Sequence, residues 1–178
     1  MQVNDGYADR MVDSCPGMGE PRWLDEVERD TWLRFAPLML LLPLELDRQL
    51  QRDSGISLMD YYVMSGLSAA PDRSLRMSTL ATWTGMQLPR LSQVAGRMEA
   101  RGWITRRPDP ADGRYTLAAL TDAGFEVLEA AAPGHVANVR RLIFDPLTRA
   151  QVGQLGAASG RILGVVLPGE QQWPDRTD

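Results

Sequence analysis

Hydrophobic residues recur at helical spacing along most of the chain. Between Leu24 and Arg52 an apolar residue stands at every third or fourth position, which predicts one long helix, and Gly55 supplies its end. Pro37 and Pro43 lie inside this segment. Each proline removes a backbone N–H donor and crowds the preceding turn, so we expect a kink or a break into two helices.

A second helix is predicted from its first residues. Ser57 precedes Asp60 by three positions, which is typical of a helix start, and the apolar run that follows extends to Ala69. Pro71 disfavours helical backbone at the residue before it, so we expect the helix to end there.

Two shorter helices follow, joined by a tight turn. The first is predicted over residues 79–84, with Ser78 as its N-cap and Gly85 at its end. The second is predicted over residues 89–101; it opens on a proline, which suits a first helical turn, and Gly102 follows it. Two short helices joined by a turn that contains glycine form the helix-turn-helix pattern.

Extended segments flank this pair of helices. Residues 75–77 are predicted as a short extended piece before it. After it, residues 103–107 have strand composition, residues 108–113 have turn composition, and residues 115–120 are predicted as the returning strand. The resulting hairpin would form a wing beside the second short helix.

Two further helices are predicted after the hairpin. Thr121 is expected to cap a long helix that runs to about Phe144. Residues 145–148 then lead into a last helix that ends near Leu167. The predicted fold class is therefore mainly α with a small β-hairpin wing.

The charge distribution points to a nucleic-acid surface. The chain holds 19 basic and 23 acidic residues, a net charge of −4 that by itself argues against such a partner. Between Arg73 and Arg114, however, the chain has eight basic and three acidic residues, a net charge of +5. The rest of the chain has a net charge of −9. Such asymmetry within one chain is a hint of nucleic-acid contact.

The second short helix carries side chains suited to reading bases. Arginine pairs bidentately with guanine and glutamine with adenine in the major groove. The residues outside its apolar stripe that supply such groups are Gln87, Arg90, Ser92 and Gln93. Arg97 lies further along the helix, where we expect it to contact phosphate.

The hairpin carries a cation at its turn. Arg114 follows Asp112 by two positions and suits the narrow minor groove, where Asp112 would hold its guanidinium in a fixed pose. Arg76, Arg106 and Arg107 are expected to add backbone contacts. The alternative is that these arginines only solvate a surface, as charge runs commonly do. The order of helix, turn, helix and arginine-flanked hairpin favours DNA binding.

These residues resemble the winged helix-turn-helix regulators of the MarR family over about residues 24–163. The segments that carry the resemblance are Leu80-Ala81, residues 91–104 (LSQVAGRMEARGWI), residues 109–114 (DPADGR) and residues 120–124 (LTDAG).

The resemblance implies a homodimer whose first and last helices interlock and whose two winged domains bind a pseudo-palindromic operator on double-stranded DNA. It matches Arg114 to the wing-tip arginine, Asp112 to its orienting acid, and Arg90, Ser92 and Gln93 to base-reading positions. Pro89 stands where the family commonly has a small polar residue, and Gln93 where a basic residue is frequent. These departures affect the expected base preference.

Apolar surface at both ends independently predicts a homodimer, because one small winged domain cannot cover it. The residues concerned are Trp23, Trp32 and Phe35 in the first helix and Leu155, Ile162, Leu163 and Val166 in the last. The predicted organisation is a flexible arm (1–20), a helical dimerisation region (21–55 and 122–167), a winged helix-turn-helix DNA-binding region (56–121) and a flexible tail (168–178).

Aromatic and methionine side chains on the first two helices allow two interpretations. They form hydrophobic core, which is the commoner use of such stripes, or they line a pocket for a small aromatic or phenolic effector, as in ligand-responsive members of the family. The residues are Trp32, Phe35, Met39, Met59 and Tyr62.

The chain offers little for catalysis or metal binding. Cys15 and His135 are its single cysteine and single histidine, which cannot make a Cys/His zinc site, so no cofactor is predicted. Cys15 is interpreted as a spectator thiol rather than a redox sensor, and His135 as a satisfied or exposed side chain rather than a ligand. An enzyme would need a positioned base that the sequence lacks.

The sequence shows neither a secretory signal at its N-terminus nor an apolar stretch long enough to cross a bilayer. We therefore expect a cytoplasmic regulator, in function a homodimeric repressor that an effector releases from its operator. The alternative is a winged-helix module that binds proteins and no DNA.

Overall fold

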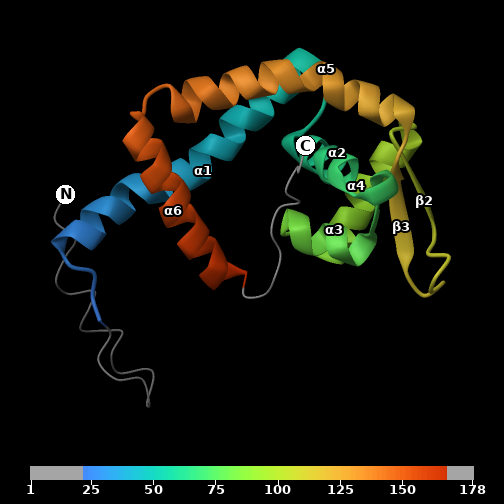
Figure 1. The fold of residues 1–178 in the computed structure, drawn as a ribbon, viewed down its shortest axis with the longest axis horizontal. Helices are drawn as coiled ribbons and strands as arrows, with labels where there is room; N and C mark the ends of the chain where they lie inside the picture. Colours follow the sequence, from blue (N-terminus) through green and yellow to red (C-terminus); the bar gives the residue numbers. More distant parts are fainter. Residues whose placement is uncertain (1–21, 168–178) are drawn as a thin grey trace. The chain divides into compact units, whose positions relative to one another are not determined.

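The computed structural model describes residues 22–167 (Figure 1). The chain divides into two compact units, residues 1–41 and 42–178. The expected arm (1–20) and tail (168–178), and with them Cys15, lie outside the described residues. Within the described part, no helix has the length and apolar character needed to span a membrane.

The first helix, α1, runs without a break from Glu26 to Ser54, so the expected division into two helices at Pro37 or Pro43 is wrong. Each proline removes one backbone N–H donor, whereas the leucines between and beyond the two prolines are strong helix formers. Toward its C-terminal end α1 buries Leu46, Gln49 and Leu50.

The predicted capping pair starts α2 (Leu58–Ala69). The Ser57 hydroxyl accepts from the Asp60 backbone N–H at 3.0 Å, and the Asp60 carboxylate accepts from the Ser57 N–H at 3.0 Å, which satisfies two backbone donors at once. A short 3-10 turn, Pro71–Arg73, then leads to strand β1 (Ser74–Arg76).

The helix-turn-helix is formed by α3 (Met77–Thr84) and α4 (Leu88–Ala100). Ser78 does not cap α3: the strand leads straight into the helix, so Arg76 occupies the N-cap position and buried Met77 is the first helical residue. Gly85 ends α3 in the left-handed conformation, at φ 67°, as its position predicts.

The hairpin is part of a three-stranded antiparallel sheet of order β1-β3-β2. Strands β2 (Ile104–Pro108) and β3 (Thr116–Leu120) form the predicted wing. β1 pairs with the outer edge of β3, with Leu75 opposite Ala118. The expected extended piece therefore becomes a strand that ties the start of α3 to the wing.

The long helix predicted after the hairpin consists of α5 (Asp122–Val139) and a π-helical turn, Arg140–Phe144. Thr121 caps it, accepting from the Gly124 N–H at 3.0 Å. Gly124 allows the first turn of α5 to approach the residue before β2 closely, because a Cβ there would clash with the Trp103 carbonyl oxygen. The last helix, α6 (Arg149–Val166), has its own capping pair of Thr148 and Gln151 and buries none of its residues.

The core of the second unit lies among α2, α3, α4 and the sheet. Its largest fully buried side chains are Leu50, Ile56, Met64, Leu67, Leu80, Leu91, Met98 and Ile104. Because α4 contributes two of these and β2 one, the core fixes α4 beside the wing. The predicted fold class, mainly α with a small wing, is confirmed.

Candidate nucleic-acid interface

Helix α4 has one buried and one polar face. Its buried stripe is Leu91, Val94, Ala95 and Met98, which packs into the core. The six residues predicted for DNA contact on this helix are all exposed: Gln87, Pro89, Arg90, Ser92, Gln93 and Arg97. Because most of them fall in the first two turns, the N-terminal half of α4 presents donors and acceptors to solvent.

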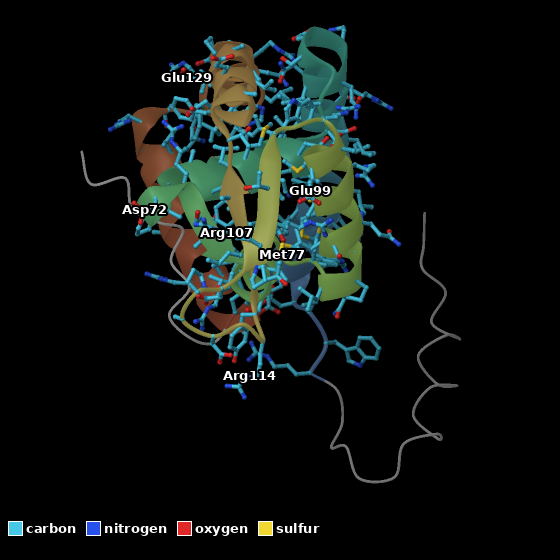
Figure 2. The ribbon with its side chains drawn as sticks, turned by 90° about the vertical axis from the view of Figure 1, so that its right-hand side faces the viewer. Asp72, Met77, Glu99, Arg107, Arg114 and Glu129 are labelled. Atoms are coloured by element: carbon cyan, nitrogen blue, oxygen red, sulfur yellow. The ribbon has the colours of Figure 1, made fainter. Side chains whose placement is uncertain are left out.

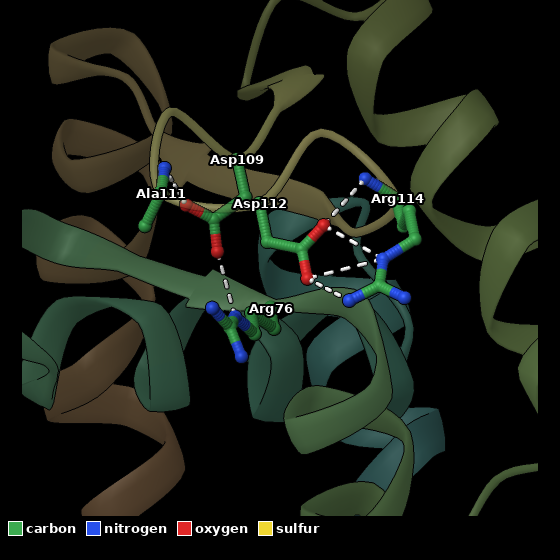
Figure 3. A network of polar contacts seen from close by, with 5 residues as sticks. All are labelled: Arg76, Asp109, Ala111, Asp112 and Arg114. Atoms are coloured by element: carbon green, nitrogen blue, oxygen red, sulfur yellow. Dashed lines mark hydrogen bonds and ion pairs between the residues drawn. The ribbon is translucent and has the colours of Figure 1, made fainter.

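At the tip of the wing, Asp112 holds Arg114 as predicted (Figure 3). The Asp112 carboxylate accepts from Arg114 Nε at 3.0 Å and from Nη2 at 2.7 Å. The pair lowers the pKa of Asp112 and raises that of Arg114, so both stay charged at neutral pH. The Arg114 side chain remains 83% exposed, so a fixed cation faces solvent.

A second ion pair lies at the base of the wing loop and was not foreseen (Figure 3). Arg76 Nε donates to Asp109 at 2.7 Å, and the Arg76 guanidinium stacks on the Tyr115 ring with its carbon 4.4 Å from the ring centroid. Asp109, whose side chain is 8% exposed, also accepts from the Ala111 N–H at 2.9 Å. The Ala111 bond and Arg76 lower the pKa of Asp109. Arg76, predicted to contact DNA, thus holds the wing loop to β1.

A third ion pair joins α4 to β2. The Glu99 carboxylate accepts from the Arg106 backbone N–H at 2.9 Å and from its Nε and Nη2 at 3.0 and 2.7 Å. These bonds lower the pKa of Glu99. In Figure 2 Glu99 lies well away from the wing tip that carries Arg114. Asp109 and Asp112 stand in Asp-Pro and Asp-Gly turn motifs, so the sequence indicates that both lie in the wing loop. No sequence motif indicates the pairing of Glu99 with Arg106, which the folded structure shows.

These pairs locate the surplus positive charge. Each of the three acidic residues between Arg73 and Arg114 is bonded to an arginine of the same segment. Arg73 pairs with Asp122, outside the segment, at 3.2 Å, so the remaining positive charge rests on Arg90, Arg97, Arg101 and Arg107. Three of these, Arg90, Arg97 and Arg107, lie exposed on α4 and β2. The surplus positive charge thus lies on α4 and the wing.

The five residues considered for an effector pocket fall in different units. Trp32, Phe35 and Met39 belong to the first unit and are exposed, whereas Met59 and Tyr62 are half-buried against the core of the second. A cavity of about 560 Å³ lies in the second unit between α2 and α5, and none of the five lines it. Its lining includes Tyr61, Ser65, Arg73, Phe125, Leu128 and Glu129.

His135 is buried on α5 rather than exposed. Its ring centroid lies 4.3 Å from that of Tyr61, and within the described residues its Nδ1 has no hydrogen-bond partner. Burial lowers the pKa of His135, so the ring is neutral at pH 7. The described part of the chain shows no cluster of three or more His, Cys, Asp or Glu residues that would hold a metal ion.

Comparisons with known proteins agree with this geometry. Residues 54–114 match the model of the MarR family. Sco3205 from Streptomyces coelicolor, a MarR family transcriptional regulator solved in complex with DNA, is 40% identical, with a TM-score of 0.80 over 88% of this chain and 98% of that one. AbsC from the same organism, also a MarR family regulator, is 34% identical, with a TM-score of 0.77 over 82% of this chain and 98% of that one.

Among curated proteins, the transcriptional repressor MprA of Escherichia coli K12 is 26% identical over 121 residues, which are 67% of this chain and 68% of that protein. The chain belongs to the MarR family of transcriptional regulators. It is therefore a transcription factor and not an enzyme.

Proposed function

We propose that the chain is a homodimeric repressor that occupies a pseudo-palindromic operator. The observation that carries the proposal is the polar face of α4 next to a wing whose terminal arginine is fixed in place by Asp112. Residues 56–121 contact DNA in this account, and residues 21–55 and 122–167 form the dimer.

Base recognition falls to the N-terminal half of α4, lying in the major groove. Arg90 pairs with guanine and Gln87 or Gln93 with adenine, each such pair discriminating against a wrong base by about 1–3 kcal/mol. Arg97, two turns further along, neutralises a phosphate. All four side chains are exposed, so no rearrangement of the helix is needed.

The wing enters the adjacent minor groove through Arg114. Asp112 occupies the Nε and Nη2 edge of the guanidinium, so the other edge, at Nη1, is presented to the groove. The orientation is fixed before binding, which lowers the entropy lost when the side chain meets DNA. A narrow minor groove concentrates negative potential and favours such a cation.

Exposed apolar faces support the homodimer. In the first unit α1 exposes Trp32, Leu33, Leu38 and Leu40, and in the second unit α6 exposes Leu155, Ile162, Leu163 and Val166. Large apolar side chains left exposed on a helix mark an association site. A second copy of the chain covers these faces and sets two α4 helices about one helical turn of DNA apart.

In this proposal, binding of a small aromatic or phenolic effector releases the protein from its operator. The cavity between α2 and α5 supports it, since about 560 Å³ suits such a ligand and Tyr61 and Phe125 supply aromatic walls. Arg73, at the cavity edge, has its guanidinium 3.9 Å from the Phe125 ring centroid and pairs with the Asp122 carboxylate at 3.2 Å, so an acidic group of the effector would replace Asp122 as its partner.

Mobility shifts on the DNA upstream of the chain's own gene test this function. The wild-type protein is expected to shift this DNA at nanomolar concentration. Arg114→Ala should weaken the complex roughly ten-fold for every DNA sequence, because the cation that meets the negative potential of the minor groove is lost. Arg90→Ala is expected to relax the choice of base at a single position.

The control is Arg161→Ala on α6, which removes an exposed arginine outside residues 56–121, the region proposed to contact DNA. An Arg114→Ala protein that binds as wild type would contradict the assignment of the wing. Absence of any DNA affinity at low salt would instead support the alternative, a module that binds proteins only.

A further inference from the structure

The ion pair between Glu99 and Arg106 has a role in DNA reading. We propose that it is a strut that sets the position of α4 against the wing and orients the Ser92 hydroxyl, and that Arg106 itself contacts no phosphate. The inference rests on the DNA binding proposed above. It changes the interpretation of Arg106, which the sequence alone places among the phosphate contacts.

The geometry ties two elements that read different grooves. Glu99 lies in the last turn of α4, and Arg106 lies seven residues later in β2, after the turn at Gly102. Three hydrogen bonds of 2.7 to 3.0 Å, one of them from the β2 backbone, join the two residues. Because two donors of the guanidinium are used and the side chain is only 28% exposed, Arg106 is poorly placed for DNA.

The Arg106 guanidinium lies along one face of α4. Ser92, Gly96 and Glu99 follow one another at helical spacing on that face. Glu99 binds Arg106 Nη2 at 2.7 Å, and Arg106 Nη1 donates to Ser92 Oγ at 3.5 Å. Gly96 stands between them, and even a Cβ added to it would come within 3.7 Å of Nη2. The missing side chain at Gly96 thus leaves space on α4 for the Arg106 side chain.

The bond to Ser92 gives its hydroxyl a direction. Because the oxygen accepts from Arg106, its O–H points away from the guanidinium and can donate to a base. A donor at this position matches the acceptor atoms of the major groove, which are purine N7, guanine O6 and thymine O4. The strut therefore favours an acceptor at the base that Ser92 reads.

Arg107 supplies a contrast one residue away. Successive residues of a strand point to opposite faces, so Arg106 is directed at α4 and Arg107 away from it. Arg107 is exposed, whereas Arg106 is half-buried. The pair of neighbours allows a strut and a phosphate contact to be compared in one strand.

The test measures affinity against salt concentration by fluorescence anisotropy, for Glu99→Gln, Arg106→Gln and Arg107→Gln. The DNA is an operator obtained by selection from random double-stranded sequences with the wild-type protein. The strut predicts that Glu99→Gln and Arg106→Gln each weaken binding roughly ten-fold and leave the salt slope unchanged. Arg107→Gln, the matched control, should lower the slope by roughly one per protomer. The double variant should be no weaker than either single variant, because both remove the same contact.

The sign of the Glu99 effect is decisive. If Arg106 were a phosphate contact, removal of the nearby negative charge in Glu99→Gln would tighten binding, and Arg106→Gln would lower the salt slope as Arg107→Gln does. Either result overturns the strut. Should Glu99→Gln fail to fold in thermal melts, Arg106→Lys takes its place, since it keeps the charge and loses the forked geometry; affinity equal to wild type then overturns the strut. A wild-type protein that binds no DNA refutes the proposed function, a distinct outcome.

Discussion

At the scale of single residues, the interface depends on arginines that are assigned different tasks by their partners. Arg114 is held by Asp112 and stays exposed, whereas Arg76 and Arg106 are held by Asp109 and Glu99 and are partly covered. An exposed arginine held in one orientation suits contact with a DNA groove. A partly covered arginine suits a structural role, because it joins two elements of the fold. Sequence spacing predicted the first pair, because its partners are two residues apart. The other two pairs join residues brought together by folding, and no local pattern predicts them.

His135 gives a residue-scale prediction for pH. Its pKa is lowered by burial, so the unfolded chain takes up a proton near pH 6.5 at which the folded chain does not. The free energy of unfolding should therefore be constant above that pH and fall as the pH drops toward 5. Urea denaturation at a series of pH values checks this. His135→Phe should remove the slope in this range, and an unchanged slope in that variant would show that another group is responsible.

At the scale of elements, the sequence predicted a helix well where the hydrophobic periodicity and the capping residues indicate the same start. Ser57 with Asp60 and Thr121 both cap as expected because capping is a contact within one turn. The sequence failed where a neighbour decides the outcome: β1 runs into α3 because it pairs with β3, so Ser78 is no cap. The sequence also failed at Pro37 and Pro43. α1 continues through both prolines as one helix, with leucine-rich turns between and beyond them.

The exposed faces of α1 and α6 lead to a prediction at this scale. Sedimentation at micromolar concentration should show a dimer, and Ile162→Asp on α6 should shift it toward monomer by placing a charge in an apolar interface. Ala157→Asp, on the opposite side of the same helix, is the matched control and should remain dimeric. A wild-type protein that sediments as a monomer would contradict the proposed assembly.

At the scale of the whole molecule, net charge is a poor guide to the partner. The chain carries −4 overall, yet its surplus positive charge lies on α4, β2 and the turns beside them. The acidic remainder repels DNA elsewhere and helps to orient the approach. The net charge by itself argues against DNA as a partner, whereas the distribution of the charges indicates which surface would face DNA.

Selection of bound sequences from random double-stranded DNA assumes no operator and shows whether a dimer reads a palindrome with α4. The account predicts enrichment of an inverted repeat whose half-sites lie about 10 base pairs apart, centre to centre. Arg90→Ala should then lose the preference at one position in each half-site. Recovery of unenriched DNA, or of a single half-site without its inverted copy, would contradict a dimer that reads a palindrome with α4.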